Sequence, residues 1–330
     1  MNVLVTGACG YIGSHAVRCL LRAGHRPIAL DSLSRGHRES LPRGVPFAQL
    51  DMRETDSLVE ILQEHAVDCV LHFAALGYVG ESVEQPLTYY DNNSRGMLSL
   101  LQALERASVQ RLVFSSTCAT YGEPEVVPIG ELATQRPINP YGWSKLFSER
   151  MLFDYAACNK DFAFAALRYF NVAGSSEDGA VGEDHNPETH LIPVILQTKL
   201  GLREKVVIFG DDYPTDDGTC IRDYIHVEDI VEAHVEVVAA LKPGARLVYN
   251  LGIGRGYSVK EIIAAAHGVI GEFHVEIGPR RPGDPPVLYA DVGKIQRELG
   301  WVARRSDIRA MIETAWRWFE RHPRGYASQR

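Results

Sequence analysis

The fold is decided by one stretch at the N-terminus, Asn2-Val3-Leu4-Val5-Thr6-Gly7-Ala8-Cys9-Gly10-Tyr11-Ile12-Gly13. Residues 2–6 are typical of a first strand, residues 7–13 form a glycine-rich turn, and a helix is expected over residues 12–23. In such a unit the first glycine permits the tight turn, the second lets a ligand approach the backbone, and the third packs helix against strand. The helix N-terminus then offers amides and a positive dipole end to a phosphate. The stretch therefore predicts a dinucleotide-binding turn, although two residues rather than one separate its first two glycines.

Outward from this stretch, short β-branched runs alternate with helical ones. We expect further strands at residues 27–31, 46–50, 67–73, 111–116 and 162–168, and helices at residues 94–107 and from Pro140 onward. This alternation predicts the α/β class, with a doubly wound, Rossmann-like parallel sheet. Beyond about residue 171 the segments 174–187 and 210–218 are rich in Gly, Asp and Pro, which indicates loops. We therefore expect a dinucleotide-binding domain over residues 1–171 and a smaller C-terminal substrate lobe over residues 172–330.

The composition limits the kinds of partner. A net charge of -8 over 330 residues argues against a nucleic-acid surface, although local arginines could still bind an anionic small ligand. No signal peptide and no apolar run long enough to span a bilayer is found. The 6 cysteines are scattered without a Cys-x-x-Cys pair, which is typical of reduced thiols in a cytoplasmic protein. We expect no metal site, no nucleic-acid partner and no membrane partner.

Asp31 ends the second expected strand, about eighteen residues after Gly13. A carboxylate at this position accepts hydrogen bonds from an adenosine ribose diol and repels a 2′-phosphate, so NAD is favoured over NADP. The nearby Arg35, His37 and Arg38 could accommodate a 2′-phosphate, but we expect them in a solvated loop.

Tyr141 and Lys145 lie four residues apart in the segment Tyr141-Gly142-Trp143-Ser144-Lys145, which places a phenol and an ammonium on one helix face. The positive charge is expected to lower the pKa of the phenol toward the range of a base. Upstream, Ser115 and Thr117 stand where a strand ends, at the sheet edge where such folds bind ligands. A hydroxyl there could bond a substrate oxygen beside Tyr141, and the set indicates hydride chemistry.

The chain resembles the extended short-chain dehydrogenases/reductases and, within them, the UDP-glucose 4-epimerases. The likeness runs nearly end to end, and its carriers include Val5-Thr6-Gly7, His72-Phe73-Ala74-Ala75, Val79-Gly80-Glu81-Ser82, Tyr89-Tyr90-Asp91-Asn92-Asn93, Leu167-Arg168-Tyr169-Phe170-Asn171, Ile208-Phe209-Gly210 and Arg281-Pro282-Gly283-Asp284. The glycine turn and the Tyr/Lys pair mark only the superfamily. The segments most specific to the 4-epimerase branch are Asp212-Tyr213-Pro214-Thr215 and Arg222-Asp223-Tyr224-Ile225-His226-Val227.

The resemblance implies an epimerisation of UDP-glucose and UDP-galactose with tightly bound NAD. In the family, the residue matching Tyr141 takes the proton of the sugar 4′-hydroxyl while NAD takes hydride from C4′, and hydride returns to the other face of a 4-keto sugar. Lys145 would bond the nicotinamide ribose and lower the pKa of Tyr141, and Thr117 would orient the 4′-oxygen. A homodimer is also implied, as is a return of the chain to the cofactor domain near residues 222–252, with a strand near residues 248–251.

The same resemblance assigns contacts residue by residue. The expected cofactor contacts are Gly7, Gly10, Tyr11, Ile12, Gly13, Asp31, Ser34, Asp51, Met52, Phe73, Ala74, Ala75, Asn92, Ser115, Tyr141, Lys145 and Phe170. The expected substrate contacts are Thr117, Tyr141, Asn171, Leu191, Phe209, Arg222, Arg281 and Asp284, with the two arginines suited to a diphosphate.

Four positions depart from the family pattern. Gly77 stands where a cofactor-binding lysine can occur, and Thr117 replaces a serine. His190 stands where an asparagine often contacts the substrate, which leaves that contact in doubt. Leu288 aligns with a position beside the sugar that is tyrosine in some members and smaller in others, so a larger N-acetyl sugar is neither supported nor excluded.

Three alternatives are weighed. Sugar-nucleotide dehydratases and decarboxylases place an acid just after the strand-end hydroxyl, whereas Thr117 is followed here by Cys118-Ala119-Thr120, which weighs against both. A 4-epimerase of another nucleotide sugar, such as UDP-N-acetylglucosamine, UDP-xylose/arabinose or UDP-glucuronate, remains open. A non-catalytic NAD(P)-binding regulator is disfavoured because Tyr141 and Lys145 are both present.

Overall fold

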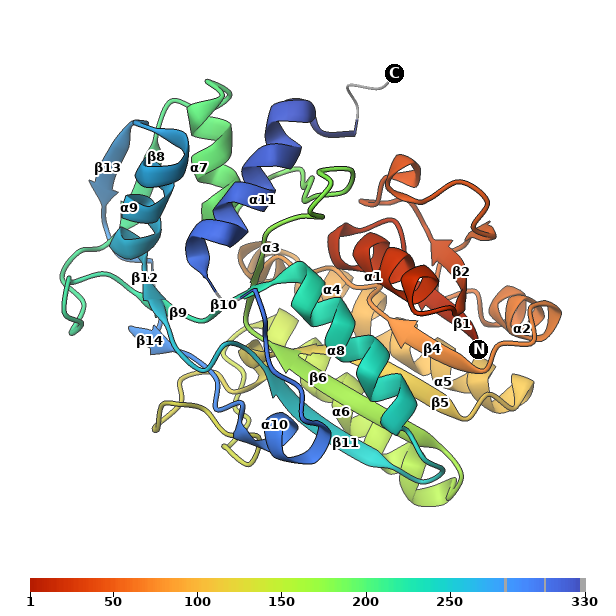
Figure 1. Ribbon diagram of the computed structural model, residues 1–330. Helices are drawn as coiled ribbons and strands as arrows, with labels where there is room; N and C mark the ends of the chain where they lie inside the picture. The colour runs from red at the N-terminus through yellow and green to blue at the C-terminus, as the bar shows by residue number, and fades with distance from the viewer. Residues whose placement is uncertain (282–283, 306, 327–330) are drawn as a thin grey trace.

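A parallel sheet of seven strands forms the centre of the computed structural model, which describes residues 1–281, 284–305 and 307–326 (Figure 1). Its strand order is β11-β6-β5-β4-β1-β2-β3. The bounds are β1 Asn2–Thr6, β2 Arg26–Asp31, β3 Phe47–Gln49, β4 Cys69–His72, β5 Arg111–Thr117, β6 Ala163–Tyr169 and β11 Arg246–Leu251. All neighbouring pairs are parallel. The order reverses between β1 and β4, and ligands of open α/β sheets bind at such a switch point.

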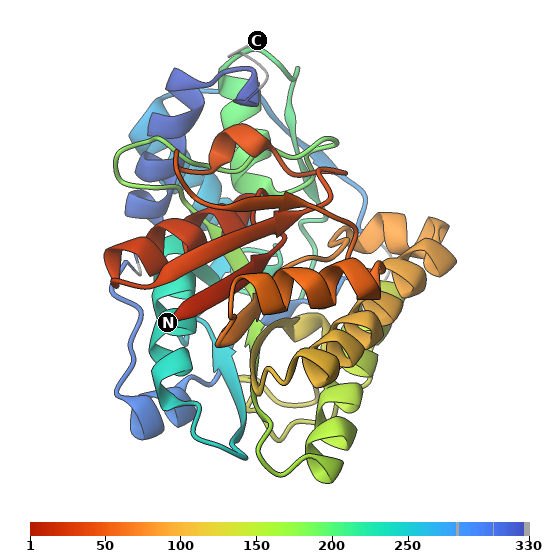
Figure 2. The same ribbon diagram turned by 90° about the vertical axis from the view of Figure 1, so that its right-hand side faces the viewer.

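Two helical layers cover the sheet, one on each face (Figures 1 and 2). Successive residues of a strand point to opposite faces, so apolar residues along the strands make both faces apolar. Val3 and Val5 pack into the core on the side of α1 (Tyr11–Arg22), α8 (Val227–Ala240) and α10 (Gly293–Leu299). Leu4 packs into the opposite core, on the side of α2 (Thr55–Glu64), α5 (Gly96–Ala107) and α6 (Pro140–Cys158). Both faces of the sheet are therefore buried, which is why apolar residues on its central strands do not simply alternate with polar ones.

A separate core lies among the helices α7 (Leu191–Lys199), α9 (Val259–Ile270) and α11 (Ile308–Arg321). Beside them, β8 (Val206–Phe209) pairs with β13 (Val275–Gly278). Short strands connect this region to the sheet edge: β12 (Tyr257–Ser258), β9 (Ile221–Arg222) and β14 (Val287–Leu288) form one set, and β7 (Asn171–Ala173) pairs with β10 (Tyr224–His226). The carboxyl edge of the large sheet faces this smaller core (Figure 1).

The predicted α/β class and Rossmann-like sheet are confirmed, and the predicted strands match those of the structure to within a few residues at their ends. One helix differs: the segment expected at residues 94–107 begins as a π-helical turn, η2 (Tyr90–Arg95), and becomes α5 only at Gly96. The Asn93 side chain bonds both backbone groups of Leu76 and the Ser144 hydroxyl, and these bonds hold the wider turn in place. The remaining elements are α3 (Val79–Glu84), α4 (Pro86–Tyr89), η1 (Arg38–Ser40) and η3 (Cys118–Thr120).

Two expectations from composition can be compared with the structure. All cysteines are free thiols, as their scattered spacing predicts. Within the described ranges, no helix combines the length and the apolar character needed to cross a membrane.

Candidate active site

A cavity of about 510 Å³ opens at the carboxyl ends of the large sheet, at the switch point between β1 and β4. Most of the predicted site residues line it: Gly7, Gly10, Tyr11, Ile12, Gly13, Asp31, Ser34, Asp51, Met52, Phe73, Ala74, Ala75, Asn92, Ser115, Thr117, Tyr141, Lys145, Phe170, Asn171, Arg222 and Asp284. Segments far apart in the sequence thus meet in one hollow. Leu191, Phe209 and Arg281 are not among its lining residues.

The glycine turn has the geometry that a dinucleotide requires. Gly7 has a φ of +66°, and a Cβ there would lie 2.6 Å from the backbone nitrogen of Ala74. A Cβ on Gly13 would lie 2.0 Å from the carbonyl oxygen of Gly7, so only glycine lets α1 approach β1 this closely. At Gly10, which lines the cavity, a Cβ would meet only the Gly7 oxygen at 3.4 Å. The turn therefore fits a pyrophosphate at the start of α1.

Asp31 ends β2 and lines the same cavity. Its carboxylate accepts hydrogen bonds from the backbone nitrogens of Cys9 at 2.9 Å and Leu33 at 2.8 Å. Burial raises the pKa of Asp31, and these two bonds oppose that rise. The carboxylate is fixed at the strand end, in the position where a ribose diol would be bound.

The loop after Asp31 differs from expectation. Arg35 and His37 line the cavity instead of lying only in solvent. The Arg35 guanidinium pairs with Glu81 and lies 4.6 Å from the centre of the Tyr78 ring. Sequence reasoning missed Tyr78 because the ion pair and ring contact join segments more than forty residues apart, and neither segment shows a local signal.

The three predicted catalytic side chains come from two neighbouring elements. Thr117 is the last residue of β5, and Tyr141 and Lys145 lie on the first turns of α6. Asn139 caps α6 by accepting a hydrogen bond from the Gly142 nitrogen at 2.8 Å, with Pro140 at the first helical position. The Lys145 ammonium donates to the Ser115 carbonyl at 2.9 Å and lies 5.9 Å from the centre of the Tyr141 ring.

The expected lowering of the Tyr141 pKa is not found in the protein by itself. Burial raises the pKa of Tyr141 to about 12, and the hydrogen bond with Thr117 offsets only part of that rise. Burial also lowers the pKa of Lys145 to about 7, which Glu149 partly opposes. A lysine that is so easily deprotonated is a weak source of positive charge, so a second cation is needed before Tyr141 can ionise near neutral pH.

At the other end of the cavity the predicted substrate residues pair with each other. The Arg222 guanidinium contacts the Asp284 carboxylate and donates to the Ile221 carbonyl at 2.8 Å. Leu288 also lines the cavity, on β14 beside Arg222 on β9. The Arg281 guanidinium instead lies 3.8 Å from the centre of the exposed Phe209 ring, outside the lining.

The cavity wall contains a set of side chains that sequence reasoning missed. His190, which the sequence left in doubt as a substrate contact, lines the cavity together with Glu183 and His185. Burial alone would lower the pKa of each imidazole, but Glu183 and Glu188 raise the pKa of His190 to about 10 and that of His185 to about 9. The available signal was the spacing Glu183-x-His185-x-x-Glu188-x-His190, in which carboxylates and imidazoles alternate.

Comparison with known proteins places this site in a family. The model of the NAD dependent epimerase/dehydratase family matches residues 3–252. The UDP-glucose 4-epimerase of Lacticaseibacillus casei is 46% identical over 100% of both chains. That of Halalkalibacterium halodurans is 48% identical over 100% of this chain and 98% of its own.

A solved structure agrees with these relatives. The UDP-glucose-4-epimerase from Stenotrophomonas maltophila, with bound NAD and formylated UDP-arabinopyranose, is 43% identical and superposes with a TM-score of 0.95 over 98% of this chain and 99% of its own. The glycine turn, the Asp31 carboxylate and the Thr117/Tyr141/Lys145 set are thus found in a chain whose relatives are NAD-dependent isomerases. The chain belongs to the NAD-dependent epimerase/dehydratase family and, within it, to the UDP-glucose 4-epimerases.

Proposed function

We propose that the protein interconverts UDP-glucose and UDP-galactose through a transient 4-keto sugar, with NAD regenerated in each turnover. The observation that carries this proposal is the meeting of Thr117, Tyr141 and Lys145 in one cavity that also receives the glycine turn and the Arg222/Asp284 pair. A hydride carrier, a proton acceptor and a group for an anionic nucleotide sugar would then share one enclosed volume.

The NAD site follows from the cavity lining. The glycine turn would bind the pyrophosphate, Asp31 the adenosine ribose, and Lys145 the nicotinamide ribose. The remaining predicted contacts line the cavity between these points. When bound, NAD supplies a hydride acceptor at C4′ of the sugar and a positive charge near Tyr141.

The proton is moved by Tyr141. Thr117 would orient the 4′-oxygen, so that the phenolate of Tyr141 can take the hydroxyl proton and return it when the keto oxygen is reduced. Without a ligand, the pKa of Tyr141 is about 12. The positive charge of bound NAD would therefore have to add to that of Lys145 before the phenolate is favoured. Proton removal is thereby coupled to the presence of the hydride acceptor.

Elimination chemistry lacks a catalyst beside Thr117. The side chain that follows is the Cys118 thiol, and burial raises its pKa to about 12. A thiol with this pKa stays neutral at pH 7 and does not replace the acid that dehydratases and decarboxylases of this architecture use. The sugar would therefore keep all its substituents and change only at C4′.

The substrate nucleotide would occupy the end of the cavity near Arg222 and Asp284. We propose that Arg222 exchanges part of its pairing with Asp284 for the diphosphate, that Arg281 is a second donor to the diphosphate, and that Phe209 and Leu191 contact the nucleotide from outside the present lining. On this basis residues 1–171 and the returning segment near 222–252 bind NAD, and the rest of residues 172–330 binds the UDP-sugar.

The test is a product assay without added cofactor. The purified protein, incubated with UDP-galactose, is expected to yield UDP-glucose, and denaturing it should release NAD. The Tyr141→Phe variant should retain NAD and lose about three orders of magnitude or more in turnover, whereas Tyr155→Phe, on the same helix but outside the cavity lining, should keep wild-type activity. An active Tyr141→Phe variant would show that Tyr141 does not transfer the proton. If the NAD-loaded protein formed no UDP-glucose, the proposed substrate would be wrong.

A second candidate is 4-epimerisation of other UDP-sugars. Leu288 lines the cavity and leaves more space than a tyrosine would, and the Stenotrophomonas maltophila relative was solved with formylated UDP-arabinopyranose. A screen over UDP-N-acetylglucosamine, UDP-xylose and UDP-glucuronate would reveal whether any is converted faster than UDP-galactose.

We also propose a homodimer in the cytoplasm. Apolar side chains are exposed on four adjoining elements, and we infer that they form one face: Val83 of α3, Leu87 of α4, Leu98 of α5, and Trp143 and Phe147 of α6. A second copy of the chain covering this face would remove it from water. The free thiols fit a reducing compartment.

A further inference from the structure

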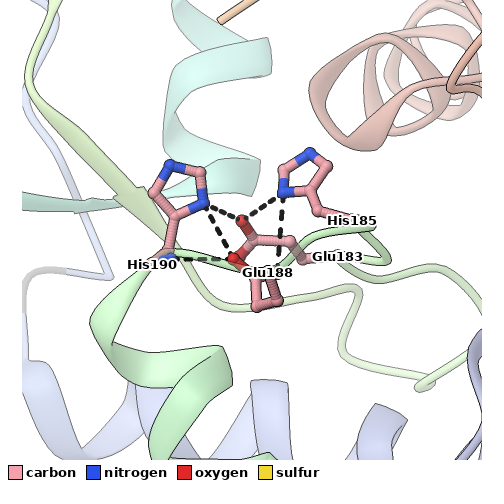
Figure 3. Close-up of side chains that lie close together, drawn as sticks. All are labelled: Glu183, His185, Glu188 and His190. Carbon is pink, nitrogen blue, oxygen red and sulfur yellow. Dashed lines mark hydrogen bonds and ion pairs between the residues drawn. The ribbon is translucent and has the colours of Figure 1, made fainter. Parts of the chain in front are cut away.

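Four side chains of one short segment point at a common centre beside the cavity (Figure 3). Glu183, His185, Glu188 and His190 each offer one ligand atom, and these atoms all lie within 4.8 Å of one another. They belong to the loop that leads into α7, and three of them line the cavity. We propose that they form a binding site for a divalent transition-metal ion, with zinc as the preferred ion.

The distances fit shared coordination. The His185 Nδ1 lies 3.0 Å from Glu183 Oε1 and 3.6 Å from Glu188 Oε2. The His190 Nδ1 lies 2.7 Å from Glu183 Oε1 and 3.3 Å from Glu188 Oε1. Tetrahedral zinc with bonds of 2.0–2.2 Å separates its ligand atoms by about 3.3–3.6 Å, so small movements would admit the ion.

Hydrogen bonding inside the cluster is incomplete, although its side chains form ion pairs. Glu188 Oε1 accepts from the backbone nitrogens of Thr189 at 2.7 Å and His190 at 2.8 Å, which fixes the carboxylate. Its other oxygen, Oε2, is buried and accepts no hydrogen bond, and His185 Nδ1 makes no aligned hydrogen bond although it lies 3.0 Å from Glu183 Oε1. The Glu188 side chain is 1% exposed, and a buried carboxylate oxygen without a donor is costly unless something else satisfies it.

The donor set selects the class of ion. Two imidazole nitrogens favour zinc and its transition-metal neighbours over magnesium and calcium, which prefer oxygen ligands. The ion would displace to solvent the protons that Glu183 and Glu188 hold on His185 and His190, after which two carboxylates and two neutral imidazoles balance its charge. With all four positions taken by the protein, the coordination is closed, which is typical of a structural site. The ion would tie the 183–190 loop into the cavity wall and take no part in hydride or proton transfer.

The test uses the NAD-loaded full chain without a histidine tag. The protein is dialysed against a chelator, returned to metal-free buffer and titrated with ZnCl₂ by calorimetry, with elemental analysis of the product. We expect one zinc per chain, a rise of a few degrees in the unfolding midpoint, weaker binding of Mn²⁺ and none of Mg²⁺. A wild-type protein that binds no stoichiometric zinc would refute the site and leave the cluster as an ion-pair network.

Two variants assign the binding to this cluster. Glu188→Gln keeps an acceptor for the two backbone donors but removes the carboxylate ligand, and should weaken zinc binding at least about tenfold. His274→Asn removes a half-exposed histidine from the β8–β13 side of the molecule and should leave binding unchanged. Circular dichroism and NAD content check that both variants are folded. Equal zinc binding by Glu188→Gln and the wild type would overturn the proposal.

Discussion

The Tyr141 phenol lies in surroundings that by themselves oppose its ionisation. Its pKa of about 12 is set by burial, and Lys145 compensates little because its own pKa is lowered to about 7. The ammonium still lies within a few ångströms of the ring and of the cavity. On the proposed mechanism, the positive charges of Lys145 and bound NAD would act together, and each would lower the cost of the phenolate.

This arrangement predicts the effect of Lys145→Met on the pH profile. Without the ammonium, Tyr141 should ionise at higher pH, so turnover near pH 7 should fall about 10- to 100-fold and recover partly as the pH rises. The check is kcat for UDP-galactose between pH 6 and 10 in the wild type and the variant, at equal NAD content. A uniform loss of kcat with an unmoved profile would mean that Lys145 only positions the cofactor.

His72 predicts a second pH effect, on stability. Burial and, to a smaller extent, the nearby Lys145 lower the pKa of His72 to about 3, and its Nδ1 lies 2.7 Å from the Thr6 hydroxyl. Because the unfolded chain binds the proton more readily, the stability contributed by neutral His72 is present above pH 6.5 and is lost as the pH falls toward 3.

The variant His72→Asn retains a polar atom near Thr6 but does not titrate. Between pH 7 and pH 5 the free energy of unfolding should fall about 2 kcal/mol more in the wild type than in this variant. The unfolded chain binds one extra proton over about one and a half pH units, from pH 6.5 to pH 5, and each unit costs about 1.4 kcal/mol. Urea unfolding at the two pH values measures the difference. Parallel losses in both proteins would show that His72 is not held neutral.

Among the elements, the sequence predicted the strands of the large sheet and the glycine turn well, because each leaves a local signal. β1 has an apolar run at residues 3–5, and Gly7 and Gly13 stand where side chains would clash with backbone atoms. The π-helical turn η2 was not predicted, since it depends on Asn93 bonding to segments distant in the chain.

Where a family motif covered the candidate site, most of the predicted residues line the cavity, with Phe209 and Arg281 as exceptions. The residues missed, such as Tyr78 and Tyr326, reach the cavity only through tertiary packing: the Tyr326 ring stacks on His37 with centroids 5.1 Å apart, although 289 residues separate them. The raised pKa of Tyr141 could not be predicted from the sequence. The spacing shows that Lys145 is a neighbour, but it does not show that burial raises the pKa of the phenol more than the lysine lowers it.

The contact between β1 and α1 predicts a sharp contrast between two glycines. A methyl group at Gly13 would meet the Gly7 carbonyl at 2.0 Å, whereas nothing lies within 4 Å of a Cβ on Gly80 in α3. We expect Gly13→Ala to cost about 3 kcal/mol or more and to abolish NAD retention, and Gly80→Ala to be neutral or to stabilise by up to about 1 kcal/mol. Thermal unfolding and NAD content measure both, and a stable, NAD-loaded Gly13→Ala variant would contradict this account of the turn.

For the whole molecule, the exposed apolar face over α3 to α6 predicts how copies associate. Phe147 is 43% exposed, and its ring centre lies 5.6 Å from that of Trp143. A charge in the middle of a dimer interface is costly to bury. We expect the wild type to scatter light as a dimer and Phe147→Glu as a monomer.

The control for association is Val302→Glu, which places the same charge at an exposed apolar position outside this face. It should leave the dimer intact. If Phe147→Glu formed dimers of unchanged stability, the interface would have to lie on another face. A monomeric wild type would exclude the dimer.

The central claim is that hydride leaves C4′ of the sugar and returns to the same carbon without exchange with water. It is tested most directly with UDP-galactose labelled with deuterium at C4′, incubated with the enzyme in ordinary water and without added NAD. Mass spectrometry of the UDP-glucose formed should show that the deuterium is retained at C4′. Its replacement by solvent hydrogen would contradict transfer through the bound cofactor.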